Sequence, residues 1–316
     1  MGVWSDEMGI LSNKKVAFVF PGQGSQAVGM GKDFYDNSEI GKDFFKKADS
    51  ILDFSLSDLC FDGPIEILSK TVNTQTALYT VSAIAYEILK EHIKPFVCAG
   101  HSAGEYVALF AAKAFDFENG LKLISKRAFF MNQISQANLG SMAAVLNLPI
   151  ETIQEINDKV SGICVTANIN TPVQIVVSGE KEAIEQAIPL YKEAGAKRVL
   201  PLNVSGAFHS PLMKEAEIKL GEYLQSIEIS KLEVPVIANI TAEIENEPEE
   251  IKKNLKSQIT GSVQWVKSCT KMAEMGTEVF VELGSGSVLT GLIKKICPDI
   301  PVYSVFSTEG IKELVD

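Results

Sequence analysis

The segment that decides the fold of this chain reads Phe96-Val-Cys-Ala-Gly-His-Ser-Ala-Gly104. Phe96 to Gly100 is a short apolar run, and a helical run from Glu105 to Ala114 follows the turn. A strand, a tight turn and a helix in this order are typical of α/β proteins. Val16 to Phe20, which ends at Pro21-Gly22, is continuously apolar and indicates a second strand, buried on both faces as in a parallel sheet.

The stretch from about residue 140 to residue 203 shows a different order of predicted strands and helices. A strand, a helix, two strands, a helix and a strand are expected in this order, at 142–148, 150–160, 163–169, 173–178, 180–194 and 198–202. This order is that of the ferredoxin-like split unit. The chain is therefore expected to form a large α/β domain, residues 14–137 and 204–316, with a ferredoxin-like subdomain inserted at 138–203.

The remaining elements are less strongly marked. We expect a helix that starts at Pro211, strands near 234–238 and at 278–283, and further helices at 40–52, 77–90, 119–135, 248–260 and 263–275. Residues 1–13 carry no secretion signal, and we expect them to be a loose leader.

Composition narrows the class of protein. The 316 residues are 46% hydrophobic and 22% charged, with a formal net charge of −11, which suits a soluble globular protein and argues against a nucleic-acid binder or a membrane-surface protein. No apolar stretch reaches the ~20 residues that span a bilayer. The five cysteines form no CxxC pair and there are only three histidines, so reduced thiols in the cytoplasm are expected, with no metal site and no cofactor.

Gly100-His-Ser-Ala-Gly104 also matches the pattern G-x-S-x-G. In this pattern the serine occupies a strained strand-to-helix turn that exposes its hydroxyl. The N-terminus of the following helix and the N–H of Ala103 would then face an oxyanion. Ser102 is therefore the expected nucleophile, and the large domain is expected to be α/β-hydrolase-like.

A serine nucleophile needs a base, and the chain holds only His92, His101 and His209. His92 lies in a charged stretch at a helix end, where a solvated role is expected. His101 directly precedes the expected nucleophile, and the sequence does not show which way its side chain points. His209 lies just before Pro211, which suits the first residue of a helix, so this histidine is either a catalytic base held by a rigid helix start or a helix cap at the surface.

Arg127 is one of only two arginines and lies on an apolar helical stripe. Its neighbours three and four residues away are Leu123, Ile124, Phe130 and Met131. A buried guanidinium needs an anion. That anion is either an internal carboxylate or a substrate carboxylate held by the planar fork, unless the side chain reaches the surface, and the substrate is favoured because the chain otherwise uses lysine.

Two glycine-rich stretches invite a dinucleotide interpretation, but neither fits. Gly22 to Ala27 matches G-x-G-x-x-A, yet Gly29 and Gly31 follow directly and no second strand delivers an acidic residue to a ribose. Gly284-Ser-Gly286 has Leu289 where a third glycine belongs. A nicotinamide or flavin site is not expected.

Five motifs together resemble the malonyl-CoA:acyl-carrier-protein transacylases of fatty-acid synthesis. They occur in the order and spacing of that family: Phe18-Val-Phe-Pro-Gly-Gln-Gly-Ser-Gln26, Asn73-Thr-Gln75, Gly100-His-Ser-Ala-Gly-Glu-Tyr106, Ala207-Phe-His209 and Val263-Gln-Trp265. The resemblance runs from about residue 14 to residue 310. It implies the same fold, including the small inserted lobe.

By this resemblance Ser102 is the nucleophile and His209 its base. The backbone carbonyl of Gln258 would orient the histidine, and the backbone N–H groups of Gln23 and Ala103 would form the oxyanion hole. Ala103 departs from the family, which usually has Leu there. Because the hole uses only the backbone of this residue, a changed pocket shape is expected rather than lost activity.

The resemblance also implies how the acyl group is held. Arg127 would clamp the malonyl carboxylate, and Phe208 would crowd the malonyl α-carbon, which favours malonyl over methylmalonyl. Further positions that match the substrate pocket are Gln75, His101, Asn168 and Asn170. The implied reaction is a two-step transfer from malonyl-CoA through a Ser102 ester to the thiol of acyl carrier protein. Partners are thus malonyl-CoA and that carrier protein, and we expect a monomer that binds neither nucleic acid nor membrane.

Three alternatives remain at this point. A serine hydrolase shares the nucleophile, base and hole but has no need for an arginine on a buried stripe. A transacylase that loads another acyl unit, for instance for polyketide synthesis, would share all three. An inactive carrier-protein docking module is the third. An acidic carrier would need a local basic patch on this acidic chain, and two candidates are Lys192, Lys197 and Arg198, or Lys252, Lys253 and Lys256.

Overall fold

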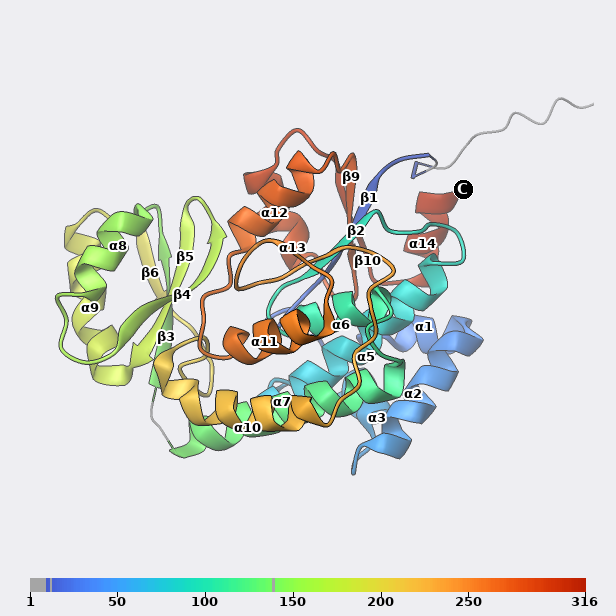
Figure 1. The fold of residues 1–316 in the computed structure, drawn as a ribbon, viewed down its shortest axis with the longest axis horizontal. Coiled ribbons are helices and arrows are strands. Elements are labelled where there is room, and N and C mark those ends of the chain that lie inside the picture. The colour runs from blue at the N-terminus through green and yellow to red at the C-terminus, as the bar shows by residue number, and fades with distance from the viewer. Residues whose placement is uncertain (1–9, 12, 138–139) are drawn as a thin grey trace, which may run out of the picture.

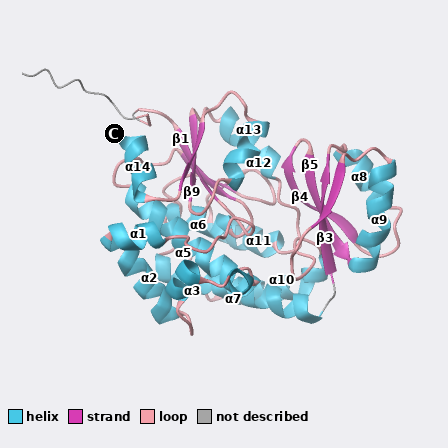
Figure 2. Cartoon of the chain, turned by 180° about the vertical axis from the view of Figure 1, so that it is seen from behind, coloured by secondary structure: helices cyan, strands magenta, loops and turns pink. Residues whose placement is uncertain are grey.

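The structure, a computed structural model, describes residues 10, 11, 13–137 and 140–316. Two sheets lie side by side along the long axis of the molecule (Figure 1), and helices surround the larger of them. The view from behind shows the same two sheets of magenta strands, with loops, α11 and α12 between them (Figure 2).

The large sheet has six strands in the order β10-β9-β1-β2-β7-β8. All neighbours pair in parallel except β7 and β8, which are antiparallel. The strands are β1 (Val16–Phe20), β2 (Val97–Gly100), β7 (Val236–Ile237), β8 (Ile244–Glu245), β9 (Val279–Leu283) and β10 (Val302–Val305).

Both faces of this sheet are covered because alternate residues of each strand point to opposite sides. On β1, Val16, Phe18 and Phe20 join a core with the helices of one face, whereas Ala17 and Val19 join a core with α12 and α13 on the other face. The result is a three-layer α/β arrangement. Its helices are α1 (Lys32–Asn37), α2 (Glu39–Ile51), α3 (Leu56–Asp62), α4 (Ile65–Leu68), α5 (Thr71–Leu89), α6 (Gly104–Ala111), α7 (Phe117–Ala137), the 3₁₀ turn η1 (Pro211–Met213), α10 (Lys214–Gln225), α11 (Pro248–Gln258), α12 (Trp265–Glu274), α13 (Val288–Ile296) and α14 (Thr308–Val315).

The small sheet is antiparallel and has the order β4-β5-β3-β6. With two helices on one face, this is the ferredoxin-like topology that the sequence predicts. Its other face, which includes Met142 and Ala144, packs into the core of the large domain. Its elements are β3 (Gly140–Leu146), α8 (Ile150–Asn157), β4 (Cys164–Thr171), β5 (Gln174–Glu180), α9 (Lys181–Glu193) and β6 (Arg198–Pro201).

The predicted fold class is confirmed, and the differences are local. The helix expected from Ala77 begins at Thr71, because the polar side chains of its first turns are bonded: the buried Thr74 donates to the Leu68 carbonyl, and the half-buried Asn73 donates to that of Ile67. The strand expected near 234–238 is a short hairpin of β7 and β8. The edge strand β10 was not predicted, because four residues with a half-buried pattern carry a weak signal.

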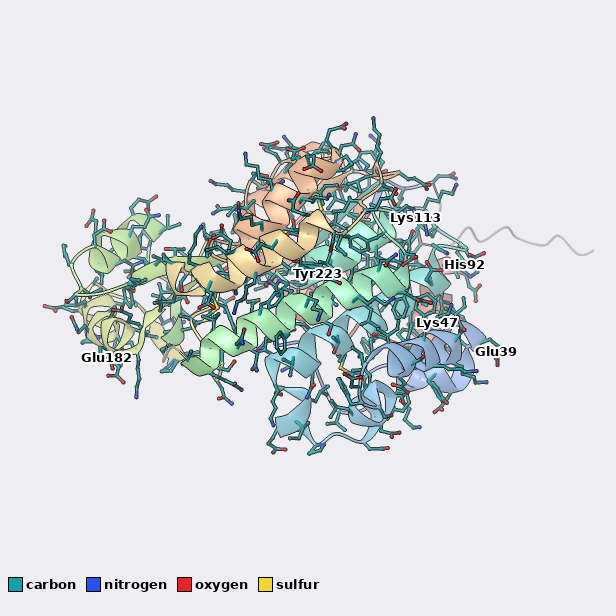
Figure 3. All side chains as sticks on the ribbon, turned by 60° about the horizontal axis from the view of Figure 1, so that its bottom comes forward. Glu39, Lys47, His92, Lys113, Glu182 and Tyr223 are labelled. Carbon is teal, nitrogen blue, oxygen red and sulfur yellow. The ribbon has the colours of Figure 1, made fainter. Side chains whose placement is uncertain are left out.

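Several expectations concern residues at the edges of the fold. Residues 1–9 and 12 of the expected leader, and 138–139 at the start of the expected insert, lie outside the described residues. Within the described part of the chain, none of the helices combines the length and the apolar character needed to cross a membrane. The cysteines are free thiols, and all but Cys297 are buried. His92 is exposed and lies toward the opposite end of the long axis from Glu182 of the small lobe (Figure 3).

Candidate active site

Ser102 occupies the turn between β2 and α6, at the carboxyl edge of the parallel sheet. Its φ of 50° lies in the left-handed region, which a side chain other than that of glycine rarely adopts. The turn is tight enough that a Cβ on Gly100 would overlap the carbonyl group of Gly104. Strain of this kind persists only where the surroundings fix the backbone.

Asn239, directly after Ile237 and Ala238 at the end of β7, supplies part of that fixation. Its Oδ1 accepts the N–H of Ser102 at 2.7 Å, and its Nδ2 donates to the carbonyl of Gly100 at 2.6 Å. One amide thus bridges both sides of the turn. The sequence analysis missed this residue. A polar residue at the end of a strand next to β2 is the signal that was available.

His209 lies beside Ser102. Its Nε2 is 2.8 Å from Ser102 Oγ, and its Nδ1 is 2.8 Å from the backbone oxygen of Gln258. A carbonyl only accepts, so Nδ1 carries the proton and Nε2 is left to accept that of the serine. Burial, and to a lesser degree the charge of Arg127, lower the pKa of His209 to about 3, so the imidazole is neutral and its Nε2 is free to accept a proton.

Arg127 of α7 lies beneath the serine and is fully buried. Its Nη1 donates to Gln75 Oε1 at 2.7 Å, and its Nη2 donates to Gln258 Oε1 at 2.8 Å and to Ser102 Oγ at 3.1 Å. Among the described residues no carboxylate comes within ion-pair distance of it, and its Nε has no partner. The sequence left open whether an internal carboxylate would neutralise this arginine; two amide oxygens hold it instead.

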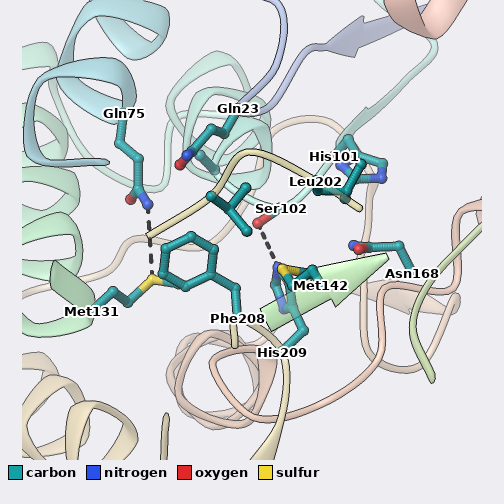
Figure 4. Close-up of a pocket in the computed structure, with 12 residues that line it drawn as sticks. Gln23, Gln75, His101, Ser102, Met131, Met142, Asn168, Leu202, Phe208 and His209 are labelled. Atoms are coloured by element: carbon teal, nitrogen blue, oxygen red, sulfur yellow. Dashed lines mark hydrogen bonds between the residues drawn. The ribbon is translucent and has the colours of Figure 1, made fainter. Parts of the chain in front are cut away.

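A cavity of about 100 Å³ opens over Ser102. Figure 4 shows the serine hydroxyl directed at His209, with Phe208, Leu202 and Met142 close to this pair. Eight of the expected site residues line this cavity: Gln23, Gln75, His101, Ser102, Ala103, Asn168, Phe208 and His209. Four apolar residues that were not expected in the site complete the lining: Met131, Met142, Leu202 and Val204.

The loop after β1 closely approaches the turn that carries Ser102. A Cβ on Gly22 would overlap the backbone oxygen of His101, so only glycine allows this approach. The contact brings Gln23 to the cavity beside Ala103. In the described part of the chain, no acceptor is bonded to the backbone N–H of either residue. Two donors of this kind are what an oxyanion requires.

Three expected site residues lie just outside the cavity. Arg127 and Gln258 lie beneath it, joined to Ser102 and His209 as described. Asn170 is bonded through its side chain to His101 Nε2 at 2.9 Å and does not line the cavity. This bond links β4 of the small lobe to the residue that precedes Ser102, and burial lowers the pKa of His101.

Comparison with known proteins gives a consistent picture. The sequence model described as acyl transferase domain matches residues 17–308. A malonyl CoA-acyl carrier protein transacylase of Bacillus subtilis is 43% identical over 302 residues, which are 94% of this chain and 95% of that protein. An acyl carrier protein S-malonyltransferase from Vibrio cholerae has a similar structure, with a TM-score of 0.91, 38% identity and coverage of 94% of this chain and 99% of that one.

A second solved structure contains a carrier protein. It is a type II PKS acyl-carrier protein in complex with its malonyl-transacylase, and the match has a TM-score of 0.93 and 36% identity and covers 95% of this chain and 99% of that one. The match of the family model, the shared fold and the identity over nearly the whole length agree. The chain belongs to the acyl transferase domain family, within the group of malonyl CoA-acyl carrier protein transacylases.

Proposed function

We propose that this protein transfers the malonyl group of malonyl-CoA to the phosphopantetheine thiol of acyl carrier protein, through an ester on Ser102. One observation carries the proposal: the hydroxyl of Ser102 lies between a neutral histidine, at 2.8 Å, and a buried arginine, at 3.1 Å. A base on one side and an uncompensated cation on the other suit a nucleophile whose acyl group ends in a carboxylate.

In the first step His209 Nε2 takes the proton of Ser102 while Oγ attacks the thioester carbon. The tetrahedral oxyanion forms next to the N–H groups of Gln23 and Ala103. When it collapses, the bond from carbon to sulfur breaks and His209 returns its proton to the departing CoA thiolate. The products are free CoA thiol and malonyl-Ser102.

The second step reverses the roles of the same groups. His209 takes the proton of the carrier's phosphopantetheine thiol, whose sulfur attacks the ester of Ser102. The bond from carbon to Oγ then breaks, and the serine regains a proton from His209. Because the Nδ1 bond to the Gln258 carbonyl holds one tautomer throughout, Nε2 exchanges the proton in both steps.

The acyl group is selected at its far end. Among the described residues no carboxylate forms an ion pair with Arg127; the amide oxygens of Gln75 and Gln258 accept from it, and its Cζ lies 5.5 Å from the centre of the Tyr106 ring. A malonyl carboxylate would complete this arrangement, whereas an acetyl group would not. Phe208 crowds the cavity beside the base and would exclude a branch on the α-carbon.

The test is incubation with malonyl-CoA and mass measurement of the intact chain, followed by addition of phosphopantetheinylated carrier protein. We expect one malonyl group on the enzyme, which moves to the carrier. Ser102→Ala should form no adduct, whereas Ser135→Ala, which removes a buried hydroxyl bonded only within α7, should form it normally. Release of free malonate in place of transfer would identify a hydrolase and refute the proposal.

We further propose a cytoplasmic monomer in which residues 14–137 and 204–316 form the catalytic domain around the insert at 138–203. The free thiols support the cytoplasmic assignment. For carrier docking, Lys192, Lys197 and Arg198 are all exposed on the small lobe, whereas Lys252 is paired with Glu249. The first set is therefore the better candidate, and carrier binding that does not weaken with salt would count against it.

A further inference from the structure

Glu105 has no part in the mechanism above, yet it is fully buried directly behind the nucleophile. It lies in the first turn of α6, three residues after Ser102. No lysine or arginine of the described residues is within ion-pair distance of its carboxylate. A buried carboxylate without an ion pair is costly, so its hydrogen bonds need an explanation.

The two oxygens of Glu105 bond to two different parts of the site. Oε1 accepts the backbone N–H of Asn239 at 3.2 Å, and Oε2 accepts from Nε2 of Gln258. Asn239 is the residue whose amide bridges the turn of the nucleophile. Both oxygens act as acceptors, as in an ionised carboxylate. Burial raises the pKa of Glu105 to about 7, and the bonds from Gln258 and Asn239 oppose this rise.

The second bond fixes which way the amide of Gln258 points. Its Nε2 donates to Glu105 and to the carbonyl of Ser102 at 3.0 Å, which leaves Oε1 to accept from Arg127. If the amide were reversed, its oxygen would face two acceptors and its NH₂ would face the guanidinium. The carboxylate thus determines that an oxygen is presented to Arg127.

We propose that Glu105 is a positioning residue, which holds the turn of the nucleophile and keeps the amide of Gln258 in the orientation that Arg127 requires. It acts on the acyl group only through Gln258 and Arg127 and contacts no reacting atom. The inference rests on the proposed function, because its readout is the choice between acyl groups. Through the chain Glu105, Gln258 and Arg127, a buried acid sets the selectivity for a carboxylated substrate.

Glu105→Gln is the direct test, because it keeps the volume and removes the charge. Its amide oxygen would face the fixed N–H of Asn239, so its NH₂ would face Gln258 and force that amide to reverse. Arg127 would then lose an acceptor. We expect the ratio of kcat/KM for malonyl-CoA to that for acetyl-CoA to fall by about tenfold or more, while acetyl transfer changes little.

Glu245→Gln is the matched control. Glu245 is also a fully buried carboxylate of the same region, but its side chain is bonded to Asn254 at 2.8 Å and reaches neither Asn239 nor Gln258. We expect this variant to keep the malonyl preference even if its melting temperature falls. An equal fall of malonyl and acetyl transfer in Glu105→Gln, as a purely structural role predicts, would overturn the inference.

A second variant tests the same series of contacts at Gln258 instead of Glu105. Gln258→Met removes the amide but keeps the backbone carbonyl that His209 uses. It should lower the malonyl preference, and adding Glu105→Gln should lower it no further, because both changes break one chain. Full preference in Gln258→Met would overturn the inference even if Glu105→Gln did not fold. An unmodified enzyme that transfers no malonyl group would instead refute the proposed function.

Discussion

Nη2 of Arg127 lies 3.1 Å from Oγ of Ser102. In the proposed malonyl ester of Ser102 the guanidinium would be close to both ends of the acyl group, since the fork that would bind the distal carboxylate also lies beside the oxygen that would be acylated. A cation at this distance stabilises negative charge on Oγ as the proton leaves, and it also disfavours a second positive charge on His209.

Arg127→Lys is expected to lose most of the preference for malonyl over acetyl. A lysine keeps the charge but has no planar fork, so it does not bond to Gln75, Gln258 and a carboxylate at once. Each hydrogen bond from a charged group that the lysine fails to make is worth ~1.5–3 kcal/mol. Competition between malonyl-CoA and acetyl-CoA measures this, and equal losses for both would mean that the arginine is structural.

The rate of acylation should be insensitive to mild acid. Burial and the charge of Arg127 lower the pKa of His209 to about 3, well below the ordinary histidine value of about 6.5, so the free enzyme keeps His209 unprotonated as the pH falls through 6.5. We expect kcat/KM for malonyl-CoA to be flat between about pH 5 and about pH 7. The acid limb of kcat should lie at higher pH than that of kcat/KM, because a bound carboxylate cancels the arginine charge.

Quenched-flow measurement of malonyl-enzyme formation across this range checks the prediction. Arg127→Ala is the comparison, because removal of the cation removes the second cause of the lowered pKa and should move the acid limb upward. An acid limb of kcat/KM near pH 6.5 in the unmodified enzyme would contradict the low pKa of His209.

The sequence predicts the parts of this site that depend on local pattern. Ser102 is marked by its two glycines, and Arg127 is marked by four apolar neighbours on one helix. Both signals come from residues close together in the sequence, and the same is true of the order of strands and helices in the small lobe. The prediction that His209 rather than His101 is the base rests on the family resemblance, because the loop that carries His209 shows no periodic sequence pattern.

Asn239 and Glu105 were not assigned a role from the sequence for a different reason. Asn239 reaches Ser102 across 137 residues, and Gln258 reaches Glu105 across 153. Neither contact leaves a periodic signal, because each depends on how β2, β7 and α11 are placed in three dimensions. Glu105 also reads as an ordinary acidic residue in the first turn of a helix.

Phe208→Leu is expected to admit methylmalonyl-CoA. The ring of Phe208 is buried at the wall of the cavity beside the base, and a smaller side chain leaves room for one methyl group on the α-carbon. Discrimination by one buried methyl is worth ~10–200-fold, so the methylmalonyl to malonyl ratio should rise within that range. Competition between the two thioesters gives the ratio, and an unchanged ratio would place the selecting wall elsewhere.

Asn239→Ala should slow acylation more than its effect on stability explains. The substitution leaves the N–H of Ser102 and the carbonyl of Gly100 without partners at a strained φ, which costs ~1–3 kcal/mol per group. Asn254→Ala is the control. It also removes a buried hydrogen bond from a side-chain amide, in this case to Glu245, but no bond of Asn254 reaches the turn of Ser102. Thermal unfolding should show a lower Tm in both variants, and the burst of malonyl-enzyme should slow by at least about tenfold only in Asn239→Ala. Equal burst rates in the two variants would mean that the turn holds Ser102 in place without the amide of Asn239.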